Sequence, residues 1–133
     1  MQEDNVIQEM KAAAKEVSEK AHCPYTKIPV GAAVLTKEGR IFVGCNVENA
    51  SLGLTICAER NAVFGAIARG QKDIAAVVIF TPTEKPATPC GACRQVISEF
   101  NPRAEVYSFC KNEEFLHYNM RELLPNPFTL DFI

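Results

Sequence analysis

Cys57-Ala58-Glu59-Arg60 and Pro89-Cys90-Gly91-Ala92-Cys93-Arg94 are the two stretches from which the rest of the chain is best interpreted. Thiolates are soft ligands, and zinc is usually held tetrahedrally by cysteine and histidine. Cys57, Cys90 and Cys93 would fill three of the four positions. A catalytic zinc site keeps its fourth position for water, whereas a structural site is closed. The two stretches therefore predict a catalytic zinc centre.

Glu59 lies two residues after the first cysteine and is not needed as a ligand, so it is free to transfer protons. A Cys-x-Glu motif followed by Pro-Cys-x-x-Cys matches the general signature of zinc deaminases. A lone Cys-x-x-Cys is a weak signal, because redox pairs and structural zinc sites also contain it. Both halves in this order are specific. The alternatives are a structural zinc site and cysteines that only fill the core.

The length of 133 residues favours one domain over residues 1–133. The composition, with 47% hydrophobic and 23% charged residues, is typical of a soluble globular protein. A net charge of −2 gives no electrostatic basis for binding nucleic acid or an anionic membrane. An acidic N-terminus and the absence of an 18-residue apolar run argue against a signal peptide and a membrane span. We therefore expect a cytoplasmic protein whose six cysteines are reduced and available for metal.

Hydrophobic periodicity and turn residues predict elements in the order α-β-β-α-β-α-β-β-α. Helices are expected at about residues 5–21, 57–69, 91–100 and 119–124, and strands at residues 30–36, 40–46, 74–80, 105–110 and about 114–118. Asn5 and Asn119 are expected to cap the first and last helices. The apolar tail, residues 126–133, is expected to pack onto this chain or a neighbour. This order predicts an α/β fold, a three-layer α-β-α sandwich with a mixed five-stranded sheet.

Both cysteine motifs fall at predicted helix N-termini, whose unpaired N–H groups lower thiol pKa values. Three thiolates and Zn²⁺ sum to −1, and a negative site acts less strongly on a bound water. Arg60, on the same helical face as Cys57, is expected to withdraw charge rather than to be a surface arginine. For Arg94 the sequence leaves both interpretations open. Asn46 and Glu48 precede the first ligand, and for them turn capping and a functional role also stay open.

The chain resembles the small, homotetrameric, zinc-dependent cytidine deaminases over nearly its whole length. Besides the two cysteine motifs, the resemblance lies in Cys23-Pro24-Tyr25, Pro29-Val30-Gly31-Ala32-Ala33, Gly44-Cys45-Asn46-Val47-Glu48-Asn49-Ala50 and Glu122-Leu123-Leu124-Pro125. It implies Zn²⁺ as cofactor and hydrolysis of cytidine and deoxycytidine to the uridine forms plus ammonia, in pyrimidine salvage. It also implies a homotetramer with active sites at subunit contacts.

The resemblance implies a role for individual residues around the metal. Cys57, Cys90 and Cys93 would hold the zinc. Glu59 would shuttle protons between water, a ring nitrogen and the leaving amine. Arg60 would hydrogen-bond the ligand sulfurs, in agreement with the charge argument above.

The resemblance also implies the contacts to a nucleoside substrate. By position, Asn46 and Glu48 would hydrogen-bond the ribose hydroxyls, and the backbone of Ala58 would contact the base. Phe128 matches an aromatic residue that closes the pocket, often that of a neighbouring subunit. Ile28 occupies a position where the family usually has a phenylalanine near the base, and it can still pack on a pyrimidine without the stacking geometry.

Leu52 is a second departure, since the family usually has a tyrosine there, near the sugar. Ile28 and Leu52 together motivate an alternative substrate, a modified cytosine nucleoside or a nucleoside antibiotic. A different class, a non-catalytic zinc-dependent assembly module, would need the cysteines but not Glu59. A nucleic-acid editing deaminase would need a basic groove, which a mildly acidic chain does not predict.

Overall fold

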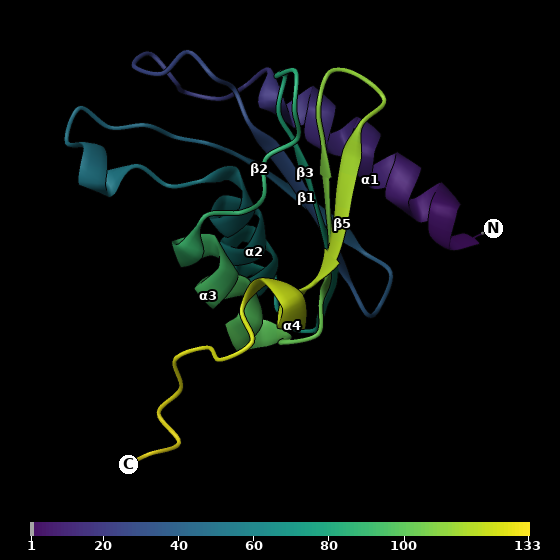
Figure 1. Cartoon of the computed structure of the whole chain (residues 1–133), viewed down its shortest axis with the longest axis vertical. Helices are drawn as coiled ribbons and strands as arrows, with labels where there is room; N and C mark the ends of the chain where they lie inside the picture. Colours follow the sequence, from purple (N-terminus) through teal and green to yellow (C-terminus); the bar gives the residue numbers. More distant parts are fainter. Residues whose placement is uncertain (1) are drawn as a thin grey trace.

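The structure is a computed structural model that describes residues 2–133, in which a five-stranded sheet lies between helices (Figure 1). The helices are α1 (Gln2–Ser18), η1 (Leu52–Leu54, a 3-10 turn), α2 (Ala58–Ala68), α3 (Gly91–Phe100) and α4 (Met120–Leu123). The strands are β1 (Gly31–Thr36), β2 (Ile41–Cys45), β3 (Ile74–Phe80), β4 (Glu105–Phe109) and β5 (Phe115–Asn119). The predicted α/β sandwich with a mixed sheet is confirmed.

The strand order is β2-β1-β3-β4-β5. Strands β3 and β4 pair in parallel, and the other neighbouring pairs are antiparallel. Parallel strands need a crossover connection, which α3 provides between β3 and β4. Strand β3 is central and almost wholly buried, which explains why its seven residues are apolar without alternation.

Side chains alternate across the sheet and build one apolar cluster on each face. Ala32 and Val34 of β1 belong to the cluster under α2 and α3, and Ala33 belongs to the cluster under α1. Figure 1 shows the same division, with α1 on one side of the sheet and α2 and α3 on the other. Glycine is required at Gly44 of β2, where a Cβ atom would lie 2.4 Å from the backbone nitrogen of Ala62 in α2.

Two helix boundaries differ from the sequence-based expectation. The prediction that Asn5 caps the first helix is wrong, because α1 already includes Gln2 and Asn5 lies inside it. The same helix ends at Ser18, whose hydroxyl donates to the carbonyl of Lys15 and so competes with continuation of the helix. The prediction for the last helix is confirmed, since Asn119 forms a capping box with Glu122.

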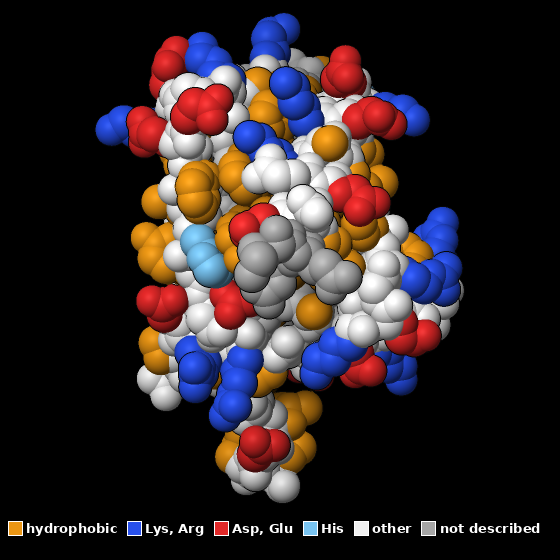
Figure 2. Space-filling view, turned by 90° about the vertical axis from the view of Figure 1, so that its right-hand side faces the viewer, with side chains coloured by type: hydrophobic (Ala, Val, Ile, Leu, Met, Phe, Trp, Pro, Cys, Tyr) orange, Lys and Arg blue, Asp and Glu red, His pale blue; other side chains and the backbone are white. Residues whose placement is uncertain are grey.

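The C-terminal tail extends away from the body of the molecule (Figure 1), and Figure 2 shows it as a protrusion with hydrophobic side chains at its surface. Phe128 is 65% exposed and Ile133 88% exposed, so these apolar side chains are not buried by their own chain, and packing onto a neighbour stays a prediction. Gln95 of α3 holds the tail through its backbone instead, donating to the carbonyl of Phe128 and accepting from its N–H. Within residues 2–133, no helix combines the length and apolarity needed to span a bilayer.

Candidate active site

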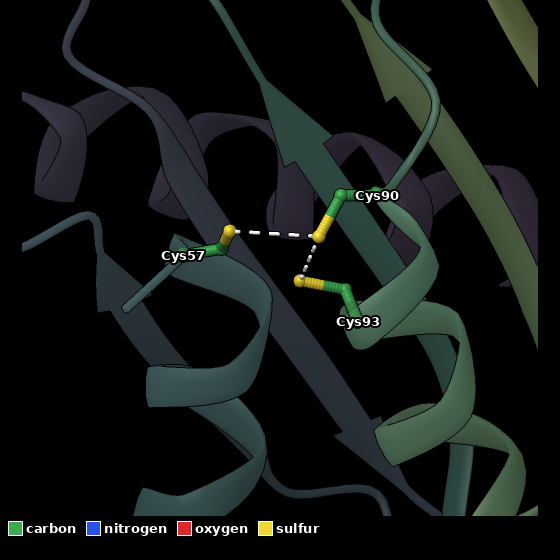
Figure 3. Close-up of side chains that lie close together, drawn as sticks. All are labelled: Cys57, Cys90 and Cys93. Atoms are coloured by element: carbon green, nitrogen blue, oxygen red, sulfur yellow. Dashed lines mark hydrogen bonds between the residues drawn. The ribbon is translucent and has the colours of Figure 1, made fainter. Parts of the chain in front are cut away.

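Two helix N-termini meet at the cysteine motifs. Cys57 is the N-cap of α2 and Cys90 is the N-cap of α3, both with extended backbone, and Cys93 lies in the first turn of α3. The three side chains point toward one another from the two helices (Figure 3), and their sulfur atoms all lie within 4.8 Å of one another. A spacing of three residues places Cys90 and Cys93 on one face of α3.

The sulfur positions fit a tetrahedral zinc ion. The Sγ atom of Cys90 lies 3.7 Å from that of Cys57 and 3.5 Å from that of Cys93. Zn–S bonds of about 2.3 Å at tetrahedral angles place the sulfur atoms about 3.8 Å apart. The cluster is therefore suited to zinc, and its three thiolates leave one position of the metal for another ligand.

The thiols also have the electrostatics of a cation site. A hydrogen bond from Cys93, together with one from Arg60 Nη2 at 3.4 Å, lowers the pKa of Cys57 to about 5. The same contact with Cys57, reinforced by burial and by the nearby Glu59, raises the pKa of Cys93 far above its usual range. A second thiolate beside the first needs a cation for charge compensation, which a metal ion supplies.

Glu59 lies in the first turn of α2 and is only 5% exposed. Burial, reinforced by the charge of Cys57, raises the pKa of Glu59 to about 7. A carboxyl group that titrates near neutral pH can both accept and donate a proton, which suits a general acid and base. The arrangement therefore places a carboxyl group that can take up and release a proton next to a cluster suited to a cation.

A cavity of about 230 Å³ opens beside the cysteines and Glu59. Its volume is below the range of about 300–1,000 Å³ that is usual for drug-sized ligands, so it fits a small ligand. The residues that line it are Val30, Asn46, Thr55, Cys57, Ala58, Glu59, Ile79, Thr81, Ala87, Thr88 and Cys90.

Asn46 and Glu48 hold the loop that connects α1 to β1. The Asn46 side chain accepts from the N–H of Val30 at 2.8 Å and donates to the carbonyl of Ile28 at 2.9 Å. The Glu48 carboxylate accepts from the backbone N–H groups of Tyr25 and Thr26 and from the Thr26 hydroxyl. These bonds, that of the hydroxyl first, lower the pKa of Glu48 and keep it ionised. The turn-capping interpretation thus describes part of what both residues do.

Among the residues expected near a substrate, Asn46 and Ala58 line the cavity, whereas Glu48 and the remaining ones do not line it within this chain. Ile28 is 43% exposed, Leu52 is 69% exposed on η1, and neither lines the cavity. Phe128 lies in a separate hollow along α3 with Gln95. Ala58 does line the cavity, as the first residue of α2.

Within residues 2–133, the hydrogen bonds found for Arg94 go to the backbone and to a hydroxyl group and not to a cysteine sulfur. Its guanidinium donates to the carbonyls of Pro89 and Leu123 and to the hydroxyl of Thr88, at 2.8, 3.0 and 3.1 Å. It therefore ties the loop before Cys90 to the end of α4. Sequence reasoning also did not single out Thr26, because its partner Glu48 is 22 residues away and no periodic pattern marks such a contact.

Comparisons with known proteins agree with this site. The family model for the cytidine and deoxycytidylate deaminase zinc-binding region matches residues 4–109. A cytidine deaminase of Sporosarcina psychrophila is 41% identical over 92% of this chain and 91% of its own length, and one of Halalkalibacterium halodurans is 43% identical over 89% and 90%. The crystal structure of cytidine deaminase from Burkholderia pseudomallei has a TM-score of 0.87 and 44% identity, covering 91% of this chain and 98% of that chain. The chain belongs to the cytidine and deoxycytidylate deaminase family.

Proposed function

We propose that this chain catalyses the hydrolytic deamination of cytidine and deoxycytidine to uridine and deoxyuridine, with release of ammonia. The observation that carries the proposal is the cluster of three cysteine sulfurs next to a small cavity, which Cys57, Cys90 and Glu59 line and in which the pKa of Glu59 is about 7. The relatives named cytidine deaminases, at 41% and 43% identity, support cytidine as a substrate. They do not favour the alternative of a modified cytosine nucleoside or nucleoside antibiotic.

Cys57, Cys90 and Cys93 would hold the zinc ion, which would supply a bound water that loses its proton near neutral pH. Glu59 accepts that proton and delivers it to the ring nitrogen as the water oxygen adds to C4 of the cytosine. Glu59 then transfers the second proton of the water to the departing amino group, so that ammonia leaves and the uracil carbonyl forms. Burial keeps Glu59 suited to both steps, because its pKa of about 7 lies near the operating pH.

Arg60 acts on the metal site through the sulfur of Cys57. Its guanidinium donates to Cys57 Sγ and withdraws negative charge from the thiolate. The backbone N–H of Ala58 belongs to the first turn of α2, where N–H groups lack helical partners, and is free to bind the base.

The sugar is bound by Asn46 and Glu48 in this proposal. Asn46 lines the cavity, and after its two bonds in the protein its amide keeps one N–H and one lone pair. On Glu48, Oε1 accepts two bonds and Oε2 accepts one, which leaves one lone pair on Oε2. A donor and two acceptors match the hydroxyl groups of a ribose ring.

The chain acts as a homotetramer with active sites at subunit contacts. The tail exposes Phe128, Leu130, Phe132 and Ile133, and contiguous apolar surfaces of this kind mark interaction sites. Because Phe128 does not line the cavity of its own chain, it would close the cavity of a neighbour. Light scattering after size exclusion tests the assembly. A cytoplasmic location and a role in pyrimidine salvage accompany this substrate class.

A deamination assay over cytosine, cytidine, deoxycytidine and 5-substituted analogues tests the substrate class. Replacing Glu59 by Ala tests the mechanism, with zinc content measured alongside. We expect zinc to be retained and turnover to fall by more than the roughly 10²–10⁴-fold typical of one proton-transfer group, because Glu59 serves twice. Unchanged turnover in this variant would refute the proton shuttle, whereas a zinc-loaded parent protein without any turnover would favour a zinc-dependent assembly module.

A further inference from the structure

The hydroxyl group of Thr26 links the backbone of Ile28 to the carboxylate of Glu48. Its Oγ1 atom accepts from the N–H of Ile28 at 3.2 Å and donates to Oε2 of Glu48 at 2.5 Å. A hydroxyl has a single proton, and the N–H of Ile28 can only donate. The hydrogen-bond direction is therefore fixed, and the proton of Thr26 points at Glu48.

This bond determines which lone pair of Glu48 stays available. The backbone N–H groups of Tyr25 and Thr26 occupy Oε1 at 3.0 and 3.2 Å. The Thr26 hydroxyl occupies one lone pair of Oε2 and leaves the other. Glu48 is 6% exposed, and this position on Oε2 is the one acceptor site that its hydrogen bonds within the chain leave unused.

The backbone around Thr26 is held in an uncommon shape. Lys27 has a φ of 60°, a conformation that few residues other than glycine adopt. Such a conformation persists when its surroundings determine it. Here Glu48 fixes the chain before Lys27, and Asn46 fixes the carbonyl of Ile28 after it. The two polar residues that precede the zinc motif and this loop thus form one rigid unit.

We infer that Thr26 is a positioning residue for sugar recognition, since its hydroxyl orients Glu48 so that the remaining lone pair of Oε2 accepts a hydroxyl of the ribose. This inference rests on the proposed role of Glu48 in binding the sugar. The alternative is that Thr26 only stabilises the loop. The two differ in one observable, because a positioning role affects substrates that carry the sugar hydroxyls and not those that lack them.

The test compares cytidine with 2′,3′-dideoxycytidine in Thr26→Val and Thr26→Ser variants. Valine keeps the shape and removes the hydroxyl, whereas serine keeps the hydroxyl. For Thr26→Val we expect the KM for cytidine to rise about ten-fold with little change in kcat, as for a lost bond to a charged group. The constants for dideoxycytidine should change less than about two-fold, and Thr26→Ser should behave as the parent with both substrates. Zinc content and melting temperature confirm that each variant is folded.

An equal loss on both substrates in Thr26→Val would overturn the inference, as would a failure of Thr26→Ser to restore the parent KM. If Thr26→Val does not fold, titration of Thr26→Ala with uridine and 2′,3′-dideoxyuridine gives the same comparison. A Glu48→Ala variant separates the two levels of the argument. If it affects both nucleosides equally, the sugar role of Glu48 fails and the inference with it. If it selectively impairs cytidine while Thr26→Val does not, the role of Thr26 alone is refuted.

Discussion

Gly44 lies in β2 directly under the first turns of α2, and replacing it by Ala is expected to disturb the zinc site without touching it. The added Cβ atom would lie 2.4 Å from the nitrogen of Ala62, 2.8 Å from the carbonyl oxygen of Ala58 and 2.9 Å from the carbonyl carbon of Asn61. All three are backbone atoms, so no side chain can rotate away. Ordinary contact begins at 3.4 Å, and α2 must therefore move by about 1 Å.

The displacement of α2 carries Cys57 and Glu59 away from the two cysteines of α3. A misplacement of about 1 Å typically costs about 10²-fold in rate. Overpacking of this kind also costs about 1–3 kcal/mol of stability, or about 3–5 °C in Tm for each kcal/mol in a chain of this size. We therefore expect kcat/KM for cytidine to fall about 100-fold and the zinc affinity to fall with it.

The matched control is Gly53→Ala, because a Cβ atom there has no neighbour within 4 Å. Deamination kinetics, bound zinc and thermal unfolding would be measured for both variants. A Gly44→Ala protein with the same kcat/KM, zinc content and Tm as Gly53→Ala would refute the argument that β2 sets the position of α2.

Replacing Cys90 by Ser should abolish zinc binding and lower Tm, because the free energy of metal binding contributes directly to folding. Metal analysis and calorimetry would measure both, and an unchanged Tm after loss of zinc would contradict the prediction. Arg94→Ala should lower the unfolding free energy by about 1–3 kcal/mol in urea titrations, and Arg94→Lys should not restore it, since lysine lacks the planar fork that bonds Pro89 and Leu123 at once. Glu48 has a pKa below 4.5 in the folded chain, so its contribution to stability is present above pH 4.5 and disappears as the pH falls through the folded pKa. The Tm difference between the parent and Glu48→Gln should therefore shrink on acidification, and a difference that is constant with pH would contradict this prediction.

The sheet and the metal motifs could be predicted because their signals are local in sequence. Strand β3 is a continuous apolar run, and Cys57 and Cys90 each directly precede a helical pattern. The meeting of the two motifs required only that both helices lie on the same face of the sheet. The α/β architecture therefore follows from periodicity and turn residues alone.

The features that sequence could not supply depend on contacts between distant segments or on water exposure. Asn5 has the chemistry of a cap, but helical backbone extends N-terminally past it. The apolar side chains of the tail predicted burial, yet Phe128 is exposed within one chain and the amide of Gln95 bonds its backbone instead. The interpretation of Arg94 stayed open because its partner Leu123 lies 29 residues further along the chain.

The side-chain amide of Gln95 forms a pair of hydrogen bonds with the backbone of Phe128, as a neighbouring β-strand would. Gln95 belongs to α3, the helix that also carries Cys90 and Cys93. A partner that binds the C-terminal residues therefore also affects the position of α3, which carries Cys90 and Cys93. Because such coupling is reciprocal, a metal ion that fixes the position of α3 also fixes the start of the C-terminal tail. Metal uptake and subunit association should consequently strengthen one another, so that zinc-loaded chains dissociate at lower concentrations than stripped ones.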